Sequence, residues 1–421
     1  MRRDGEREEK KPIIIGETAE ALPSDPLDEA MQLKEQGRTD LAAAHLLQAW
    51  IGGWREPYAA DCLLDLLQEA GQWDAAVSVA ETAVAERPDS AHFRHRLGEV
   101  LRLAGRVEVA VETLREAAYL APDSAAILLS YGRALLDLEN YPDAVAALQR
   151  CLRCDPDCAE AHALAGEAWV ALGMADRAGR SFQTALMLDP EDRAGTALRL
   201  ARLNALPPPD RAPPAYVRYL FDQYAPTFDQ QLLETLDYRG PELLATAARA
   251  LSLPEGGLSI LDLGCGTGLC GAAFRSKAAW LEGVDLSPGM IAEAGRRGIY
   301  DRLHTTDIVA FLGETTRRYD LIVAGDVLNY FGDLAPVLAV VRSVLVPEGG
   351  FLFSLEKGDD AAFRLAPSRR FVHAVAYVHD EIEAAGFSVS SFDEDAVIRM
   401  EARRPVPAII AALKRTPDPD R

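Results

Sequence analysis

The sequence has few basic residues, and this shortage limits what the protein can bind. Its 421 residues hold 44 Lys and Arg against 65 Asp and Glu, which gives a formal net charge of −21. Nucleic-acid binding depends on basic side chains that neutralise phosphates, so we expect no nucleic-acid partner. Long apolar runs are absent too. No segment has the roughly 20 apolar residues of a membrane-spanning helix, and we expect no membrane partner.

The N-terminus also lacks the features of a secretory signal. Its first residues are highly charged, and the apolar patch Ile13–Ile15 is far too short for a signal core. We therefore predict a disordered leader over residues 1–25 and a disordered tail over residues 415–421. Together these features indicate a cytoplasmic protein.

Cysteines are few and scattered, which favours reduced thiols over a disulfide framework. Cys151, Cys154 and Cys158 form a C-x2-C-x3-C pattern that could hold a metal or a cluster, but a fourth nearby ligand is missing. These cysteines fall inside a repeat, where Cys151 takes a small-residue position. We interpret them as packing residues and predict no metal site.

A repeat of 34 residues runs through the first half of the chain. Prolines, alanines and glycines keep this step: Pro88, Pro122, Pro156 and Pro190; Ala76, Ala110, Ala144 and Ala178; Gly98, Gly132 and Gly166. Small residues let two paired helices approach closely, and proline ends the second helix of each pair. Larger side chains fill the gaps between the helices, among them Leu114, Leu148 and Phe182.

This pattern resembles the tetratricopeptide repeat, with units near 57–90, 91–124, 125–158 and 159–192. Residues 26–56 resemble a degenerate earlier unit, and a helix from Glu191 to about Ala205 would cap the array. The resemblance implies an all-α helical-hairpin solenoid over residues 26–206, whose groove binds a partner protein. Self-association or simple rigidity remains the alternative role.

A proline-rich linker over residues 207–215 separates the repeats from a different kind of domain. After two or three helices, short apolar runs alternate with amphipathic segments, which is typical of a parallel sheet. We predict strands at Leu258–Leu263, Trp280–Val284, Leu303–Thr306, Leu321–Ala324, Phe351–Leu355, Phe387–Phe392 and Ala408–Leu413. We predict helices at Pro288–Arg297, Leu334–Leu345 and Ala374–Ala385.

A glycine-rich turn follows the first predicted strand, with Gly264, Gly266 and Gly268 behind the acidic Asp262. Glycines here let the backbone bend sharply and approach a ligand. A nicotinamide fingerprint would need glycine or alanine where this chain has Leu269. The pattern instead resembles the first motif of class I S-adenosylmethionine-dependent methyltransferases. This resemblance covers residues 216–414 and implies a seven-stranded, Rossmann-like α/β domain.

The resemblance also implies which residues bind S-adenosylmethionine. Asp285 and Leu286 would bind the ribose, Asp307 and Ile308 the adenine together with Met290, and Gly325 and Asp326 the methionine part. The turn itself adds Asp262, Gly264, Cys265, Gly266 and Gly268. A carboxylate at a strand's end can instead be a helix N-cap, and for Asp285 alone the two interpretations are equally good.

Residues 219–229 resemble an FDxxAxxFD segment found in one bacterial methyltransferase group. By that resemblance, Tyr224 and Phe228 close over the cofactor; the alternative is an ordinary docking helix. Methyl transfer needs alignment of the acceptor and sometimes a base. Candidate catalytic residues are Tyr330, Glu356 at the end of the fifth strand, and His373 in an Arg-aromatic-x-His element at the start of a helical segment.

These residues predict a methyltransferase that acts on a small metabolite or on a partner protein's side chain. A non-catalytic scaffold, in which the repeats assemble a complex and the second domain only holds the cofactor, is the alternative. The intact glycine and acidic motifs favour the enzyme.

Overall fold

The structure is a computed structural model that describes residues 25–55, 58–359 and 362–417. Most of the predicted leader and tail, residues 1–24 and 418–421, lies outside the described residues. The chain divides into two compact units, residues 1–70 and residues 71–421. No described helix is long and apolar enough to cross a membrane.

The described residues of the first unit form the helices α1 (Pro26–Glu35), α2 (Thr39–Ile51) and α3 (Ala59–Glu69). The Asp25 side chain caps α1 by accepting a hydrogen bond from the Leu27 amide at 3.0 Å. Ala30 and Ala42, both in register with the repeat, are fully buried. Gly37 takes a left-handed φ of 74° between α1 and α2.

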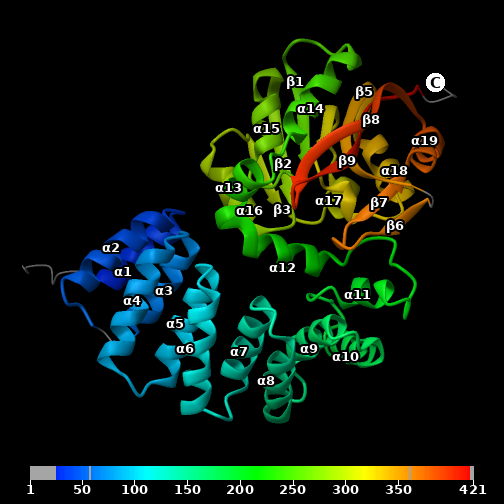
Figure 1. Cartoon of the computed structure of the whole chain (residues 1–421). Helices are drawn as coiled ribbons and strands as arrows, with labels where there is room; N and C mark the ends of the chain where they lie inside the picture. The colour runs from blue at the N-terminus through cyan, green and yellow to red at the C-terminus, as the bar shows by residue number, and fades with distance from the viewer. Residues whose placement is uncertain (1–24, 56–57, 360–361, 418–421) are drawn as a thin grey trace, which may run out of the picture. The chain divides into compact units, whose positions relative to one another are not determined.

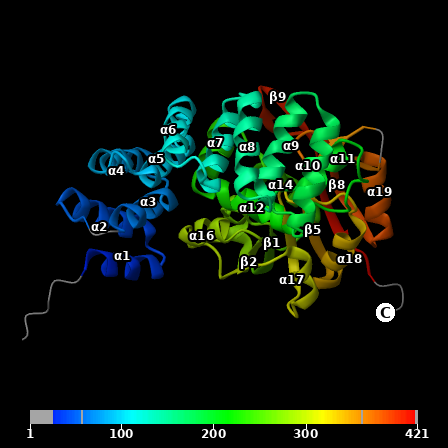
Figure 2. The ribbon, with the colours of Figure 1, turned by 90° about the horizontal axis from the view of Figure 1, so that it is seen from below.

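Seven helices at the start of the second unit follow the 34-residue step: α4 (Trp73–Glu86), α5 (Ala91–Leu103), α6 (Val107–Leu120), α7 (Ala125–Asp137), α8 (Tyr141–Cys154), α9 (Ala159–Ala171) and α10 (Ala175–Leu188). Figures 1 and 2 show α7 to α10 side by side as helical hairpins. Helices α4, α6, α8 and α10 each end two residues before a repeat proline, as the sequence predicted.

The glycines of the repeat lie where paired helices approach most closely. A Cβ atom on Gly98 would lie 2.4 Å from Leu114 Cγ, and one on Gly132 would lie 2.6 Å from Leu148 Cγ. On Gly166 it would lie 2.4 Å from Phe182 Cε1. The predicted packing of a small residue against a large one is thus confirmed in three successive hairpins.

Helix α11 (Thr196–Arg202) follows the array and is shorter than predicted. Asp192 caps it by accepting hydrogen bonds from the Thr196 and Ala197 amides. Leu198 is fully buried in an apolar cluster that also holds residues of the α/β sheet. In the segment predicted to be a linker, the Ala212 amide donates to the Tyr330 carbonyl at 2.7 Å, so this segment packs on the α/β domain.

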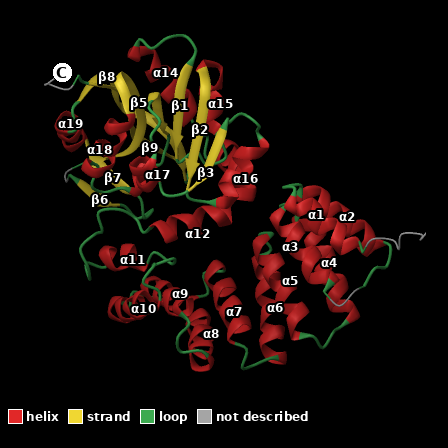
Figure 3. Cartoon of the chain, turned by 180° about the vertical axis from the view of Figure 1, so that it is seen from behind, coloured by secondary structure: helices red, strands yellow, loops and turns green. Residues whose placement is uncertain are grey.

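The second half forms one sheet, shown with its flanking helices in Figure 3. Its main strands run in the order β3-β2-β1-β4-β5, all parallel. Their bounds are β1 (Leu258–Leu263), β2 (Ala278–Asp285), β3 (Arg302–Thr305), β4 (Tyr319–Ala324) and β5 (Leu345–Gly358). The first four agree closely with the predicted strands, while β5 starts earlier and ends later.

The strands that follow β5 in the chain differ from the predicted ones. An antiparallel pair, β8 (Phe387–Glu401) and β9 (Arg404–Arg415), joins β5 through β9. A short hairpin of β6 (Phe363–Leu365) and β7 (Phe371–Ala374) joins the C-terminal end of β5. Within the described residues, the sheet therefore has nine strands where seven were predicted. His373 belongs to β7 and does not begin a helix, because its backbone pairs with both β5 and β6.

Helices cover both faces of the sheet. Their bounds are α12 (Pro214–Tyr224), α13 (Phe228–Gln230), α14 (Gly240–Ala247), α15 (Leu269–Phe274), α16 (Pro288–Arg296), α17 (Ile308–Glu314), α18 (Ala335–Val344) and α19 (Val375–Ala384). The predicted helices at 288, 334 and 374 are confirmed as α16, α18 and α19. Ile260 of β1 packs in the cluster that contains α14 and α15, whereas Leu261 packs in the cluster that contains α17 to α19.

Candidate functional site

A glycine-rich turn connects β1 to α15 at the candidate site. Gly264, Gly266 and Gly268 have φ values of 62°, 54° and 96°, which favour glycine. A Cβ atom on Gly264 would lie 2.4 Å from Val327 Cγ2, whereas one on Gly266 would meet no atom within 4 Å. The turn therefore packs on one side and leaves open space on the other, directly before α15.

Asp285, the last residue of β2, links the glycine turn to the loop that follows β2. One carboxylate oxygen accepts from the Gly266 amide and the other from the Ser287 amide, both at 2.9 Å. Burial raises the pKa of Asp285, and these hydrogen bonds oppose the rise. The carboxylate is thus fixed by backbone donors at the edge of the sheet.

Asp307 is a helix N-cap, which is one of the two interpretations open to a carboxylate at the end of a strand. Its Oδ1 caps α17 by accepting from the Val309 and Ala310 amides at 3.1 and 3.2 Å. Its Oδ2 forms an ion pair with Arg211 at 3.1 Å. Asp307 also lines a cavity, so its role as a helix cap does not remove it from the candidate site.

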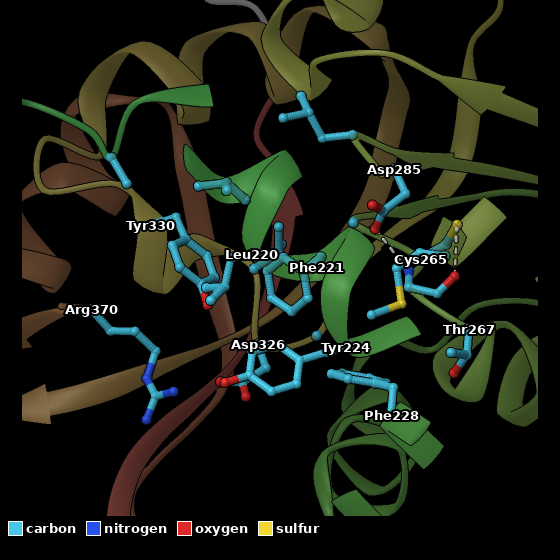
Figure 4. Close-up of a pocket in the computed structure, with 18 of the residues that line it drawn as sticks. Leu220, Phe221, Tyr224, Phe228, Cys265, Thr267, Asp285, Asp326, Tyr330 and Arg370 are labelled. Atoms are coloured by element: carbon cyan, nitrogen blue, oxygen red, sulfur yellow. Dashed lines mark hydrogen bonds between the residues drawn. The ribbon is translucent and has the colours of Figure 1, made fainter. Parts of the chain in front are cut away.

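A cavity of about 400 Å³ lies at the carboxyl ends of the parallel strands (Figure 4). That volume is within the range of pockets that bind a cofactor or small molecule. Thirteen residues predicted for the site line it: Tyr224, Phe228, Gly264, Cys265, Gly266, Asp285, Leu286, Met290, Asp307, Ile308, Gly325, Asp326 and Tyr330.

Two predicted cofactor residues, Asp262 and Gly268, are not among the described residues that line the cavity. Asp262 is buried beneath the turn, where it accepts a hydrogen bond from the Tyr300 hydroxyl at 2.7 Å. Burial raises the pKa of Asp262 to about 7. Gly268 is the N-cap residue of α15, which begins at Leu269. Both residues therefore have structural positions in or beneath the turn.

An aromatic segment from α12 and α13 covers the cavity. The Phe221 ring packs edge-on against Phe228 and Tyr330, with centroid distances of 6.0 and 5.6 Å. In Figure 4, Phe221 lies between Tyr330 and the residues around Asp285. Tyr224, which also lines the cavity, is 44% exposed, so the cover is partly open to solvent.

Two aspartates of the same segment fasten it to the glycine turn and to α16. Asp222 accepts hydrogen bonds from the Ser287 hydroxyl and from the Gly289 amide, the latter at 3.3 Å. Asp229 accepts from the Thr267 hydroxyl and pairs with Arg297. The acidic residues of the FDxxAxxFD pattern therefore position its aromatic residues.

The predicted catalytic residues do not all reach the cavity. Neither His373 nor Glu356 is among the described residues that line it. His373 is fully buried, its Nε2 lies 3.1 Å from the Gly332 carbonyl oxygen, and burial lowers its pKa to about 4. This placement favours a structural role for His373. Tyr330 does line the cavity, and burial raises its pKa above the usual value.

Glu356 belongs to a network of charged side chains beside the cavity. Arg399 is 2% exposed and pairs with Asp326 at 2.7 Å, with Glu401 at 2.8 Å and with Glu356. Arg370 pairs with Glu356 at 2.5 Å and also with Glu401. Both arginines line the cavity.

Sequence reasoning did not identify several residues that line the cavity, among them Arg211, Tyr216, Phe221, Tyr238, Thr267, Cys270, Arg369, Arg370 and Arg399. Arg399 offered one signal, because it interrupts the apolar positions of a strand between Ile398 and Met400. Most of the others come from segments outside the recognised motifs, so only the fold brings them to the site.

Comparison with known proteins gives one match to the α/β domain and two to the helical repeats. Residues 261–352 match the family described as a methyltransferase domain. Residues 131–193 match the tetratricopeptide repeat, and residues 69–151 match anaphase-promoting complex, cyclosome, subunit 3.

Individual relatives match only part of the chain. Methyltransferase-like protein 27 of Homo sapiens is 42% identical over 87 residues, which are 20% of this chain and 35% of that protein. Aklanonic acid methyltransferase of Streptomyces sp. (strain C5) is 28% identical over 145 residues, 33% of this chain and 64% of that protein. The chain thus spans between about a third and two thirds of these relatives. A solved S-adenosylmethionine-dependent methyltransferase from Clostridium acetobutylicum is 18% identical, with a TM-score of 0.36, and covers 47% of this chain and all of its own.

Proposed function

Since the chain combines tetratricopeptide repeats with a class I S-adenosylmethionine-dependent methyltransferase domain, we propose that it transfers a methyl group to a small-molecule acceptor. We assign residues 26–206 to the repeats and residues 216–414 to the methyltransferase domain, joined by residues 207–215. The observation that carries the proposal is the cavity where the glycine turn, Asp285 and the aromatic segment meet.

The residues present fit S-adenosylmethionine, which supplies a methyl group activated by a positively charged sulfur. Asp285 is held by backbone donors so that its remaining lone pairs can accept from ribose hydroxyls. Met290 and Ile308 offer apolar contact for adenine, and Asp307 offers a carboxylate for its amine. The open space beside Gly266 admits a ligand against the backbone.

On the acceptor side, Tyr330 is the predicted catalytic residue that fits. Because burial raises its pKa above the usual value, its hydroxyl stays protonated at neutral pH and can donate a hydrogen bond. We propose that Tyr330 orients the acceptor while Phe221 and Phe228 exclude water. The chemistry then depends on alignment and desolvation, with no assigned general base.

For the repeats, we propose that their groove binds a partner protein. The first helices of successive hairpins carry charged side chains that pair across the array, such as Arg102 with Asp137 and Arg133 with Glu160. A polar surface of this kind suits an extended peptide. A partner protein as methyl acceptor is the second candidate, favoured by the fusion of the two domains in one chain.

We further propose a cytoplasmic location. All six cysteines are free, and Cys154 is exposed, which suits a reducing compartment.

Calorimetry on the full chain tests the proposed function. S-adenosylhomocysteine should bind, and NAD should not. Asp285→Asn should weaken that binding by about tenfold or more, since a charged acceptor for two hydroxyls is lost. Asp380→Asn, on the exposed surface of α19, is the matched control and should bind normally. Binding of NAD alone would contradict the proposal.

Turnover is tested by incubating the full chain with radiolabelled S-adenosylmethionine and a cell extract separated into small molecules and proteins. Label in the small-molecule fraction is the expected result. Label in a protein captured by the repeats would favour the second candidate. Cofactor binding without any transfer would favour the non-catalytic scaffold.

A further inference from the structure

The cavity has a second end that the cofactor residues do not use. Figure 4 shows Asp285, Cys265 and Thr267 on one side and Tyr330 with Arg370 on the other, with Phe221 between them. Tyr330 and Arg370 lie at this second end, Arg369 is the neighbour of Arg370 in the chain and packs on the Tyr216 ring, and all four residues line the cavity. Arg370 is paired with the carboxylates of Glu356 and Glu401, whereas Arg369 is in no ion pair within the described residues.

Arg370 is held in place by carboxylates behind it. Its Nε donates to Glu356 at 2.5 Å and its Nη2 donates to Glu401. Glu356 and Glu401 are in turn fixed by Arg399, which is almost completely buried. The remaining nitrogen, Nη1, has no hydrogen-bond partner in the described part of the chain. A planar guanidinium fixed along one edge keeps its other donors in a defined direction.

Arg369 adds a second guanidinium, which packs on an aromatic ring and is not held by ion pairs as Arg370 is. Its backbone has a left-handed φ of 64°, in a turn closed by the Ala366 amide, which donates to the Arg370 carbonyl at 2.8 Å. A second hydrogen bond, from the Arg369 amide to the Ala366 carbonyl at 2.9 Å, fixes the backbone of this turn. Its guanidinium carbon lies 5.7 Å from the centroid of the Tyr216 ring. Within the described residues, it pairs with no carboxylate.

We propose that the methyl acceptor is a small aromatic acid whose carboxylate binds Arg369 and Arg370. This proposal rests on the proposed function. Two guanidinium groups present N–H donors that match the two oxygens of a carboxylate. Tyr330 lies at the same end and supplies aromatic surface for the body of the acceptor. The turn between β6 and β7 thus selects the substrate, and Glu356 and Glu401 are positioning residues for Arg370.

The test uses the full chain saturated with S-adenosylhomocysteine and two probes of equal shape. The first, 4-hydroxybenzoate, carries a carboxylate, and the second, 4-hydroxybenzamide, carries a neutral amide. Calorimetry should give at least about tenfold tighter binding for the acid, which is the usual range for a charge-assisted contact. Arg369→Gln and Arg370→Gln should each reduce this preference to threefold or less.

Two controls separate binding from folding. Arg364→Gln changes an exposed arginine on the same hairpin, outside the cavity lining, and should keep the preference. All variants should bind S-adenosylhomocysteine as wild type does, which reports an intact fold. Arg369→Gln is the safer variant, because Arg369 takes no part in the ion pairs that hold Arg370.

The two proposals fail in different ways. If S-adenosylhomocysteine binds but the acid does not bind, or binds no better than the amide, the acidic-acceptor proposal is overturned alone. Preference for the acid that survives in both arginine variants overturns it too. If S-adenosylhomocysteine itself does not bind, the proposed function fails first, and this proposal fails with it.

Discussion

Alanine at two glycines of the same turn should separate the folding role of the turn from its binding role. Gly264 and Gly266 both take left-handed conformations, so alanine is strained at either position by about 1–2 kcal/mol. The surroundings differ, because a Cβ atom on Gly264 would lie 2.4 Å from Val327 Cγ2 and 2.7 Å from Val327 Cβ. A Cβ atom on Gly266 meets nothing within 4 Å.

The overlap with Val327 sets the expected difference. Overpacking a buried site costs about 1–3 kcal/mol, so Gly264→Ala should lower the free energy of unfolding by about 2–5 kcal/mol in total. Gly266→Ala should lower it by only about 1–2 kcal/mol. The effect of alanine on the unfolded chain is the same for both variants and cancels in the comparison. Val327→Ala, added to Gly264→Ala, should recover part of the loss.

Urea unfolding of the full chain, with and without S-adenosylhomocysteine, measures both roles. Without the ligand, Gly266→Ala should lose only about 1–2 kcal/mol to backbone strain. It should also gain less stability from the ligand than wild type does, since the new methyl group occupies space in the cavity. Gly264→Ala should be the less stable variant in both conditions. If the two variants lose the same stability without ligand, contact with Val327 does not set the cost of alanine at Gly264, and the prediction is refuted.

Two further predictions concern buried groups elsewhere. Burial lowers the pKa of His373 to about 4, so the unfolded chain takes up this proton first, and about 3 kcal/mol of stability should be lost as pH falls from 6.5 to 4. Urea unfolding across that range should show this loss flattened in His373→Gln but kept in the exposed control His379→Gln. In the repeats, Gly132→Ala should destabilise by about 1 kcal/mol or more, because overlap with Leu148 exceeds the gain in helix propensity. A double-mutant cycle with Leu148→Ala should show coupling, and simple additivity would contradict this contact.

The regular elements of the fold could be predicted because their patterns are local. The proline step marked the ends of α4, α6, α8 and α10, and the apolar run of β1 was predicted to the residue. The hairpin of β6 and β7 was missed because its strands are only three and four residues long. Short strands are stabilised by the neighbours they pair with, and a single sequence does not show that pairing. His373 was therefore assigned to a helix that in fact begins two residues later.

The same distinction between local and long-range patterns applies to the candidate site. The predicted cofactor residues follow strands within recognisable motifs, and all of them except Asp262 and Gly268 line the cavity. The charged network was not, since Asp326, Glu356, Arg370 and Arg399 come from four separate segments and meet only in the folded sheet. Glu356 was noticed at a strand end, but its role depends on two arginines that share no local pattern with it.

The position of Leu198 affects how the chain can be cut for expression. This side chain of α11 completes an apolar cluster whose other members include Ala212, Tyr216 and Phe371. A fragment that starts at the proline-rich segment would lack it and leave a hole, at roughly the 2–5 kcal/mol of a deleted buried leucine. The smallest stable fragment should therefore begin upstream of Asp192, which caps that helix, even though its first residues then belong by sequence to the repeats.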